Sequence, residues 1–172
     1  MTDLGADLRV QRNVLDETDD AELAWRVIEQ VYDAVDIHDG AAALDAQLAR
    51  LTAGQRALLA LHWTVAEVDN GGFDQYFMNS TGDLAHEALA GFRLIGAERS
   101  AALLERVFKA FPGGKPPRDQ DARAALLDAL SDDERDGRFE SHDDAFYELV
   151  DSELYPRAGA YVRAHPQDFV RE

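Results

Sequence analysis

Residues 70–80 read N-G-G-F-D-Q-Y-F-M-N-S, and this stretch decides how the chain is expected to fold. Its two adjacent glycines, at 71–72, interrupt a helical pattern and permit a sharp change of backbone direction. Phe73, Tyr76 and Phe77 follow at i, i+3, i+4 spacing, which places their rings on one face of a helical turn. The stretch therefore predicts a corner at the centre of the core that fixes two helices at an angle.

The same stretch carries a family resemblance. N-G-G-F-x-Q-Y-F, followed by N-S, by G-D-L-A at 82–85 and by L-I-G-A at 94–97, resembles a family of small acidic bacterial helical proteins. The characterised member of that family is a DNA mimic, whose surface carboxylates imitate duplex phosphates and occupy a transcription factor. The resemblance is densest from about residue 67 to residue 111. It implies an all-α fold and a basic, DNA-binding protein as partner, but it assigns no partner-contacting residue.

Helical periodicity covers nearly all of the chain. Amphipathic stripes and capping residues predict helices at about 18–35, 44–52, 52–69, 83–96, 100–111, 119–130, 141–150 and 154–165. The proline- and glycine-rich segment 112–117 is the clearest loop, and residues 131–137 are expected to form a charged connection. We expect one compact all-α domain of seven or eight helices over residues 18–172. Residues 1–17 show weak periodicity and are expected to form a loose N-terminal arm.

Composition limits the class of protein. A chain of 172 residues with 46% apolar residues is large enough to bury one core. The absence of cysteine excludes disulfides and cysteine-ligated metals. The first residues are acidic and lack the apolar centre of a secretory signal. The longest apolar run, at 57–66, is too short to span a bilayer. We therefore expect a cytoplasmic protein without a membrane partner.

The charge is strongly acidic. The chain has 34 acidic and 17 basic residues, for a net charge of −17. Such a surface repels nucleic acid and anionic membranes and attracts basic proteins over about a Debye length. The charge agrees with the basic DNA-binding protein that the resemblance implies as partner, and it argues against direct binding of nucleic acid; a homodimer stays open. The alternative is that the acidity reflects solubility or a halophilic proteome.

Two groups of acidic residues show helical spacing, and they are the candidate phosphate mimics. The first comprises Glu29, Asp33 and Asp36 on the first predicted helix, with Asp39 just beyond it, and the second comprises Asp144, Glu148 and Asp151. Like charges at i, i+4 destabilise a helix by roughly 0.2–0.5 kcal/mol per pair, and this chain tolerates them in both places. Carboxylates so spaced lie about 5–6 Å apart, which is comparable with the spacing of backbone charges in DNA. The alternative interpretation is two solvated helix faces.

A second function class uses the central stretch itself. In that alternative, its polar side chains line a site for a small polar ligand or a peptide. The residues of this structural or ligand-binding motif are Asn70, Gly71, Gly72, Phe73, Asp74, Gln75, Tyr76, Phe77, Asn79 and Ser80. Side chains that face a cavity would favour the ligand site, whereas side chains that are buried and bonded to one another would favour an architectural role.

Residues 132–143 resemble an EF-hand calcium loop. Gly137 at the sixth position places Asp132, Glu134 and Asp136 at the first, third and fifth positions and Asp143 at the twelfth. Glutamate at position three and the short aspartate at position twelve depart from the EF-hand pattern. No metal site is therefore predicted.

Signals for catalysis are weak. The five histidines are scattered and form no ligand pair at helical spacing. No glycine-rich phosphate loop follows a strand, because the sequence predicts no strand. We therefore expect a protein-interaction module that is not an enzyme and needs no cofactor: a DNA-mimic-like protein that competes with DNA for its partner.

Overall fold

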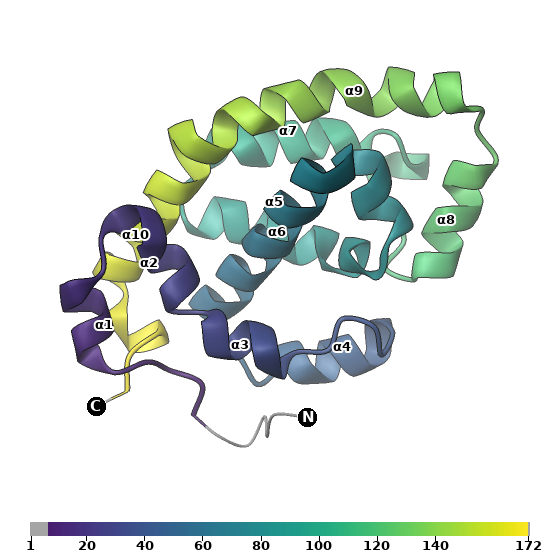
Figure 1. The fold of residues 1–172 in the computed structure, drawn as a ribbon. Coiled ribbons are helices and arrows are strands. Elements are labelled where there is room, and N and C mark those ends of the chain that lie inside the picture. The colour runs from purple at the N-terminus through teal and green to yellow at the C-terminus, as the bar shows by residue number, and fades with distance from the viewer. Residues whose placement is uncertain (1–6, 172) are drawn as a thin grey trace.

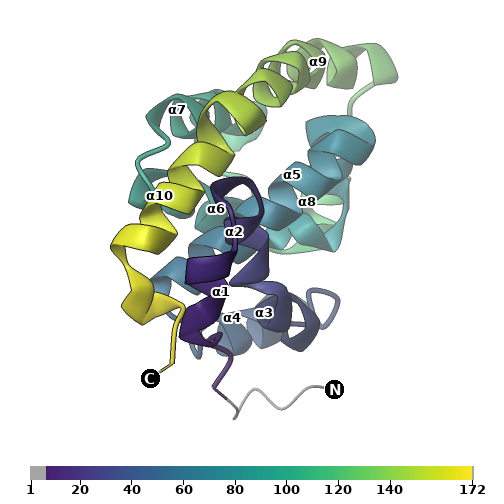
Figure 2. The ribbon, with the colours of Figure 1, turned by 60° about the vertical axis from the view of Figure 1, so that its left-hand side comes forward.

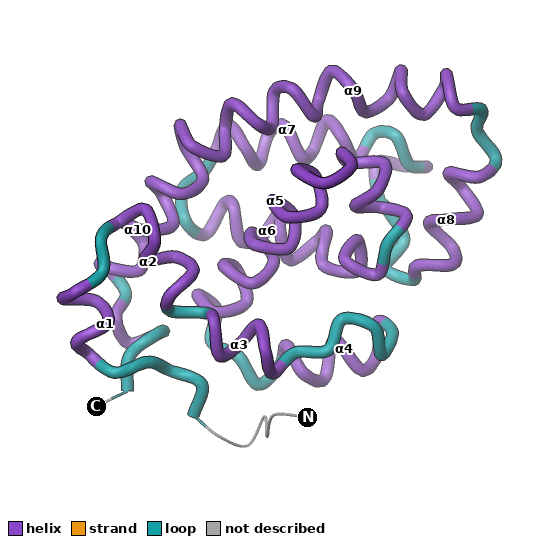
Figure 3. The backbone as a smooth tube through the Cα atoms, in the orientation of Figure 1, coloured by secondary structure: helices purple, strands orange, loops and turns teal. Residues whose placement is uncertain are grey.

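The structure is a computed structural model that describes residues 7–171, and in this range it is an all-α body without a β-strand (Figure 1 and Figure 3). The α-helices in chain order are α1 (Arg12–Glu17), α2 (Asp20–Arg26), α3 (Glu29–Ala34), α4 (Ala41–Leu48), α5 (Ala53–Met78), α6 (Ala85–Leu94), α7 (Glu98–Phe108), α8 (Gln120–Asp128), α9 (Asp132–Leu149) and α10 (Tyr155–Ala164). The prediction of a single compact all-α domain is confirmed.

Helix α5 runs through the middle of the molecule, and most other helices pack around it (Figure 1 and Figure 2). A capping box opens it, as predicted: Thr52 Oγ1 accepts the Gln55 N–H at 3.1 Å, and Gln55 Oε1 accepts the Thr52 N–H at 3.1 Å. Helix α6 approaches closely at Gly91, where a Cβ would lie 2.9 Å from the Cα of Ala57. The two helices therefore pack nearly backbone to backbone.

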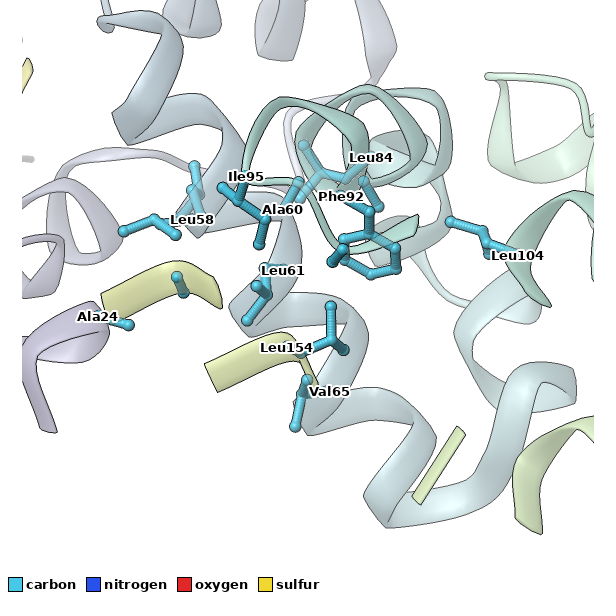
Figure 4. Close-up of a cluster of buried hydrophobic side chains, with 14 of the residues drawn as sticks. Ala24, Leu58, Ala60, Leu61, Val65, Leu84, Phe92, Ile95, Leu104 and Leu154 are labelled. Atoms are coloured by element: carbon cyan, nitrogen blue, oxygen red, sulfur yellow. The ribbon is translucent and has the colours of Figure 1, made fainter. Parts of the chain in front are cut away.

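The core lies where α5, α6 and α7 meet one another and the segment that follows α9. Figure 4 shows Leu61 and Val65 of α5 beside Leu154, which follows α9, and Phe92 of α6 near Leu104 of α7. All five side chains are buried. Burying an aliphatic or aromatic side chain of this size contributes about 1.5–3 kcal/mol, so this convergence is the main source of stability.

The predicted corner interrupts α5 at the two glycines. Gly72 has φ +72°, which L-residues rarely adopt, so the helix direction changes there. The aromatic rings that follow are fully buried. Phe73 packs edge-on against Phe146 of α9 with ring centroids 5.3 Å apart, and Phe77 packs against Phe111 at 4.8 Å. The prediction of a central corner is confirmed, and the corner joins α5 to α9.

A fully buried arginine closes the end of α5. The Arg123 guanidinium, on α8, donates to the carbonyl oxygens of Phe77 at 3.0 Å and Asn79 at 2.8 Å. It also lies 2.7 Å from the carboxylate of Asp83, in the short 3-10 turn Ser80–Leu84. These contacts satisfy carbonyls that the last turn of α5 leaves without helical partners. The sequence predicted Asp83 as the first residue of a helix; in the structure it lies in the 3-10 turn before α6 and is 2% exposed.

Two predicted helix boundaries are wrong. The first predicted helix, 18–35, is divided into α2 and α3 by a break around Val27 and Ile28, both of which are buried. Residues 131–137 were predicted as a connection, but Ser131 is the N-cap of α9 and forms a capping box with Glu134, and residues 132–137 belong to the helix. Helix α9 therefore begins nine residues before residue 141, where the predicted helix started, and continues through Gly137.

A π-turn, Val150–Leu154, joins α9 to α10. Its Glu153 is buried and accepts the Ser100 N–H at 2.7 Å, the Ser100 hydroxyl at 2.6 Å and the Arg99 N–H at 3.2 Å. Burial raises the pKa of Glu153, but these bonds outweigh it and leave the pKa lowered. The carboxylate thereby caps the first turn of α7 and fixes the end of α9 against it.

The predicted loose arm is packed over residues 7–17. Leu8, Val10 and Leu15 are buried. Val10 donates to the Phe169 carbonyl at 2.8 Å and accepts from the Arg171 N–H at 3.0 Å, which ties the two ends of the described chain together. The prediction is therefore wrong for residues 7–17, and residues 1–6 lie outside the described residues. Among residues 7–171, no helix is long and apolar enough to cross a membrane.

Candidate interaction surface

The outer face of α9 carries a line of carboxylates, here called the α9 row. Its members are Asp133, Glu140, Asp144, Glu148 and Asp151. The first four lie within about 80° of one another on a helical wheel, and Asp151 extends the line into the π-turn. All five are exposed. At the helical rise of 1.5 Å per residue the row is about 27 Å long.

The carboxylates of the α9 row are not used within the fold. Among residues 7–171, none of the five accepts a hydrogen bond or an ion pair. The opposite face of α9 buries Phe139, Phe146 and Leu149. Phe139 stacks on Phe77 with ring centroids 6.0 Å apart. The helix is therefore anchored in the core by one face while the other presents unpaired charge to solvent.

The corner of α5 supports the same helix through Asp143. The Phe73 N–H donates to Asp143 Oδ1 at 2.8 Å. A Cβ on Gly72 would collide with the Asp143 carboxylate, so glycine is needed there for space as well as for its positive φ. Burial raises the pKa of Asp143; the Phe73 N–H opposes this effect, and Asp144, Asp74 and Glu140 add to it. The corner thus contacts α9 at Asp143, where several carboxylates lie near one another.

Two further acids of α5 lie beside α9. Asp69 precedes the corner, and burial together with the negative charge of Asp151 raises its pKa. Asp74 follows the corner; burial is the main cause of its raised pKa, and Arg135, 3.7 Å away, opposes it. The hydroxyl of Tyr147 donates to the Val68 carbonyl at 2.9 Å. The acidic surface is therefore built from two elements, with the corner of α5 flanking the α9 row.

The other predicted group of acids has a different structure. Helix α3 ends at Ala34, so Asp36 lies beyond it and the predicted helical stripe of Glu29, Asp33 and Asp36 is wrong; Asp39 lies beyond the helix, as predicted. Glu29 pairs with Arg26 at 2.9 Å, and Asp36 Oδ1 accepts the His38 N–H at 2.8 Å. Figures 1 and 2 place α3 and the body of α9 at opposite edges of the bundle, with α5 between them. The two predicted groups therefore do not form one surface.

The polar side chains of the central motif bond to neighbouring groups. Gln75 Nε2 and Asn79 Nδ2 both donate to Glu67, at 2.8 and 2.9 Å. The Tyr76 hydroxyl lies 3.2 Å from Thr64 Oγ1, and burial raises its pKa. Ser80 Oγ lies 3.0 Å from His38 Nδ1. Most of the polar groups that a ligand would need are thus engaged in the fold, as an architectural role requires.

The EF-hand alternative is wrong. Residues 132–143 form helix rather than a loop, so their carboxylates are distributed around α9 instead of converging on one ion. In residues 7–171 no group of three histidine, cysteine, aspartate or glutamate side chains is arranged to hold a metal.

Three of the five members of the α9 row were predicted from the sequence, and Asp133 and Glu140 were not. The available signal was the spacer Ser131-x-x-Glu134, a capping box that marks the true start of α9. Once the helix starts there, Asp133 and Glu140 fall on the face of Asp144. Asp69 was missed because its place beside Asp151 depends on tertiary packing.

Comparison with known proteins supports a family assignment. A family model described as DMP19-like protein matches residues 49–165, which include the corner and all of α9. No curated protein and no solved structure matches the chain.

Proposed function

Because the chain belongs to the DMP19-like protein family, we propose that it is a DNA mimic that presents the α9 row to the DNA-binding face of a basic protein. The partner is a transcription factor or a nucleoid protein, and the complex excludes DNA from it. The family match supports mimicry as the kind of function. The α9 row is the surface that we assign to it.

The observation that carries the proposal is the unpaired state of the α9 row. Five exposed carboxylates lie along about 27 Å of helix, a mean separation of about 6–7 Å. A duplex presents a comparable line of negative charge to the lysines and arginines that neutralise its phosphates. Asp69 adds charge beside the row.

Rigidity supports the same assignment. A mimic must present its charges in a fixed register, because ordering flexible side chains and helices on binding costs affinity. Helix α9 is fixed by Phe139 and Phe146 in the core, by the bond from Phe73 to Asp143, and by Glu153 at its end. Its carboxylates are therefore positioned before any partner arrives.

The proposed action is electrostatic competition without catalysis. A partner that binds DNA through basic side chains meets, in this protein, a surface that is negatively charged as DNA is. The net charge of −17 accelerates the encounter. Binding to the protein and binding to DNA are then mutually exclusive, because both use the same basic face. The interaction weakens as salt screens the charges.

The test is capture of the partner from the native lysate at low salt, followed by displacement with duplex DNA. The tagged chain is compared with D144N/E148Q/D151N, which neutralises three members of the α9 row. The control D16N/E17Q/E22Q removes the same charge from exposed positions on α1 and α2. We expect the wild type and the control to retain a basic DNA-binding protein that duplex DNA releases, and the α9 variant to lose it.

Two outcomes would contradict the proposal. If both variants retain the captured protein equally, the α9 row is not the binding surface. If no basic protein is retained by the wild type, the acidity serves solubility or life at high salt.

A further inference from the structure

A pocket of about 450 Å³ is lined by residues 33–38, which include the end of α3, and by Trp63 of α5. Asp33 and Asp36 are among its lining residues, and both are exposed. Trp63 of α5 and His38 are the aromatic residues of the lining. The lining therefore brings two aspartates and a tryptophan together.

The indole of Trp63 is held in place by other aromatic side chains. Tyr32 stacks on it with ring centroids 4.8 Å apart and an interplanar angle of 22°. Tyr32 is held in turn by edge-on contacts with Trp25 at 5.4 Å and His62 at 5.3 Å. Because Tyr32 covers one face of the indole, the remaining surface of Trp63 is what the pocket can offer to a ligand.

The acidic wall is also fixed. Gln47 of α4 accepts the Asp36 N–H at 2.8 Å and donates to the Asp36 carbonyl at 3.1 Å. The flanking Val35 and Ile37 are buried. The Asp36 carboxylate itself is oriented by the His38 N–H. The pocket thus exists before a ligand binds, which lowers the cost of binding.

We propose that this pocket binds one arginine side chain of a protein or peptide partner. A planar guanidinium stacks on an indole and forms directional bonds with carboxylates, whereas a lysine ammonium is a more strongly hydrated point charge. The lining of the pocket includes Trp63, Asp33 and Asp36. Most of its lining residues lie at or just after the end of α3, and α3 lies at the opposite edge of the bundle from α9 (Figure 1), so this is a contact separate from the proposed mimicry.

The experiment is an NMR titration of the full ¹⁵N-labelled chain with the peptide acetyl-Gly-Arg-Gly-amide. The chain has two tryptophans, so the variant W25F assigns the indole signal of Trp63. Matched peptides with citrulline or lysine in place of arginine test charge and planarity separately. The isosteric variant D33N/D36N tests the wall, and D144N/E148Q/D151N is the control for a general loss of negative charge.

We expect the arginine peptide to cause a saturable shift of the Trp63 indole signal and of backbone amides in residues 33–38. Because charge-assisted bonds to a guanidinium are lost, the dissociation constant should be at least about tenfold higher for the citrulline peptide and for D33N/D36N. The α9 variant should bind the arginine peptide as the wild type does. Equal shifts with citrulline, equal affinity for lysine, unchanged binding by D33N/D36N or the absence of a saturable shift would each overturn the proposal. None of these results depends on the partner of the α9 row.

Discussion

The acids of α9 and the acids around α3 show the same spacing in the sequence but have different surroundings in the structure. Asp144 and Glu148 lie on a continuous helix and have no partner among the described residues. Glu29 is paired with Arg26, and Asp36 lies beyond the end of its helix and holds the His38 N–H. Spacing of carboxylates therefore identifies a charged row only where the helix continues and the fold leaves the charges free.

Local sequence explains the difference in helix length. Helix α9 has a capping box at Ser131 and buries Phe139 and Phe146 on its inner face, so it extends for 18 residues despite its like charges. Helix α3 has six residues and no side-chain cap, and its chain becomes extended at Val35. The α9 acids thus form an extended surface, whereas Asp33 and Asp36 line a local pocket.

The largest expected effect is on the corner that supports α9. Gly72→Ala should lower the free energy of unfolding by about 3–5 kcal/mol, because it adds strain at positive φ and disrupts the charged bond to Asp143. Gly113→Ala is the reference for positive φ without a neighbour: its φ is +66° and its ψ 12°, against ψ −177° at Gly72, and a Cβ there meets nothing within 4 Å. Its cost should be about 1–2 kcal/mol. Urea denaturation measures the free energy of unfolding of both variants. Equal costs would show that contact with Asp143 does not add to the cost of Gly72→Ala.

The next effect is on partner affinity. D144N/E148Q/D151N should weaken binding of the captured partner about a hundredfold at low salt, if each charge contributes about 1 kcal/mol. The triple variant should unfold at the same or a higher temperature than the wild type, because like charges on one helix face repel. Calorimetric titration gives the affinity and a thermal melt gives the stability. A loss of folding in this variant would mean that the row has a structural role.

A smaller effect is expected on the pH dependence of stability. The pKa of Asp143 is raised in the folded state by burial, so folding favours its protonated form. This contribution is fully present below the ordinary pKa of an aspartate, about 3.9, and is lost as pH rises through the raised value. Asp143→Asn removes the titration but can still accept the Phe73 N–H. It should raise stability at pH 7 by about 0.5 kcal/mol, the scale of a screened charge.

The measurement is the free energy of unfolding of Asp143→Asn and wild type between pH 4 and pH 7. The advantage of the variant should shrink toward the acid end. An advantage that is the same at both ends would show that charge at Asp143 is not the cause.

The smallest expected effect separates the two acidic regions. D33N/D36N should leave the affinity for the DNA-competed partner within about twofold, which is the range of long-range screening alone. The measurement is the same calorimetric titration used for the α9 variant. A loss as large as that of the α9 variant would mean that the partner contacts both edges of the molecule.

Sequence periodicity predicted the helical class and the central corner, because both depend on local signals. The two glycines and the i, i+3, i+4 aromatic residues mark the corner by themselves. Helix boundaries were less accurate where local signals competed. The charged segment 131–137 was assigned to a loop by its polarity, although Ser131 and Glu134 form a capping box that starts α9.

Long-range polar contacts had no such signal. Arg123 was one of several charged residues on an amphipathic pattern, and only the packed structure shows it bonded to the end of α5 and to Asp83. Glu153 and Asp143 likewise cap α7 and the corner from distant positions in the chain. Three of the five members of the α9 row were predicted, because their spacing is a local feature of the sequence. That their carboxylates have no partner in the described residues is a property of the fold.

The most direct test of the account is the salt dependence of partner affinity for the wild type, D144N/E148Q/D151N and the charge-matched control D16N/E17Q/E22Q. The affinity of the wild type and of the control should fall steeply and in parallel as salt rises. The α9 variant should bind weakly at low salt and lose little more on addition of salt, because the charges that salt screens are gone. Equal salt slopes for all three proteins would contradict the assignment of the α9 row as the mimic of DNA.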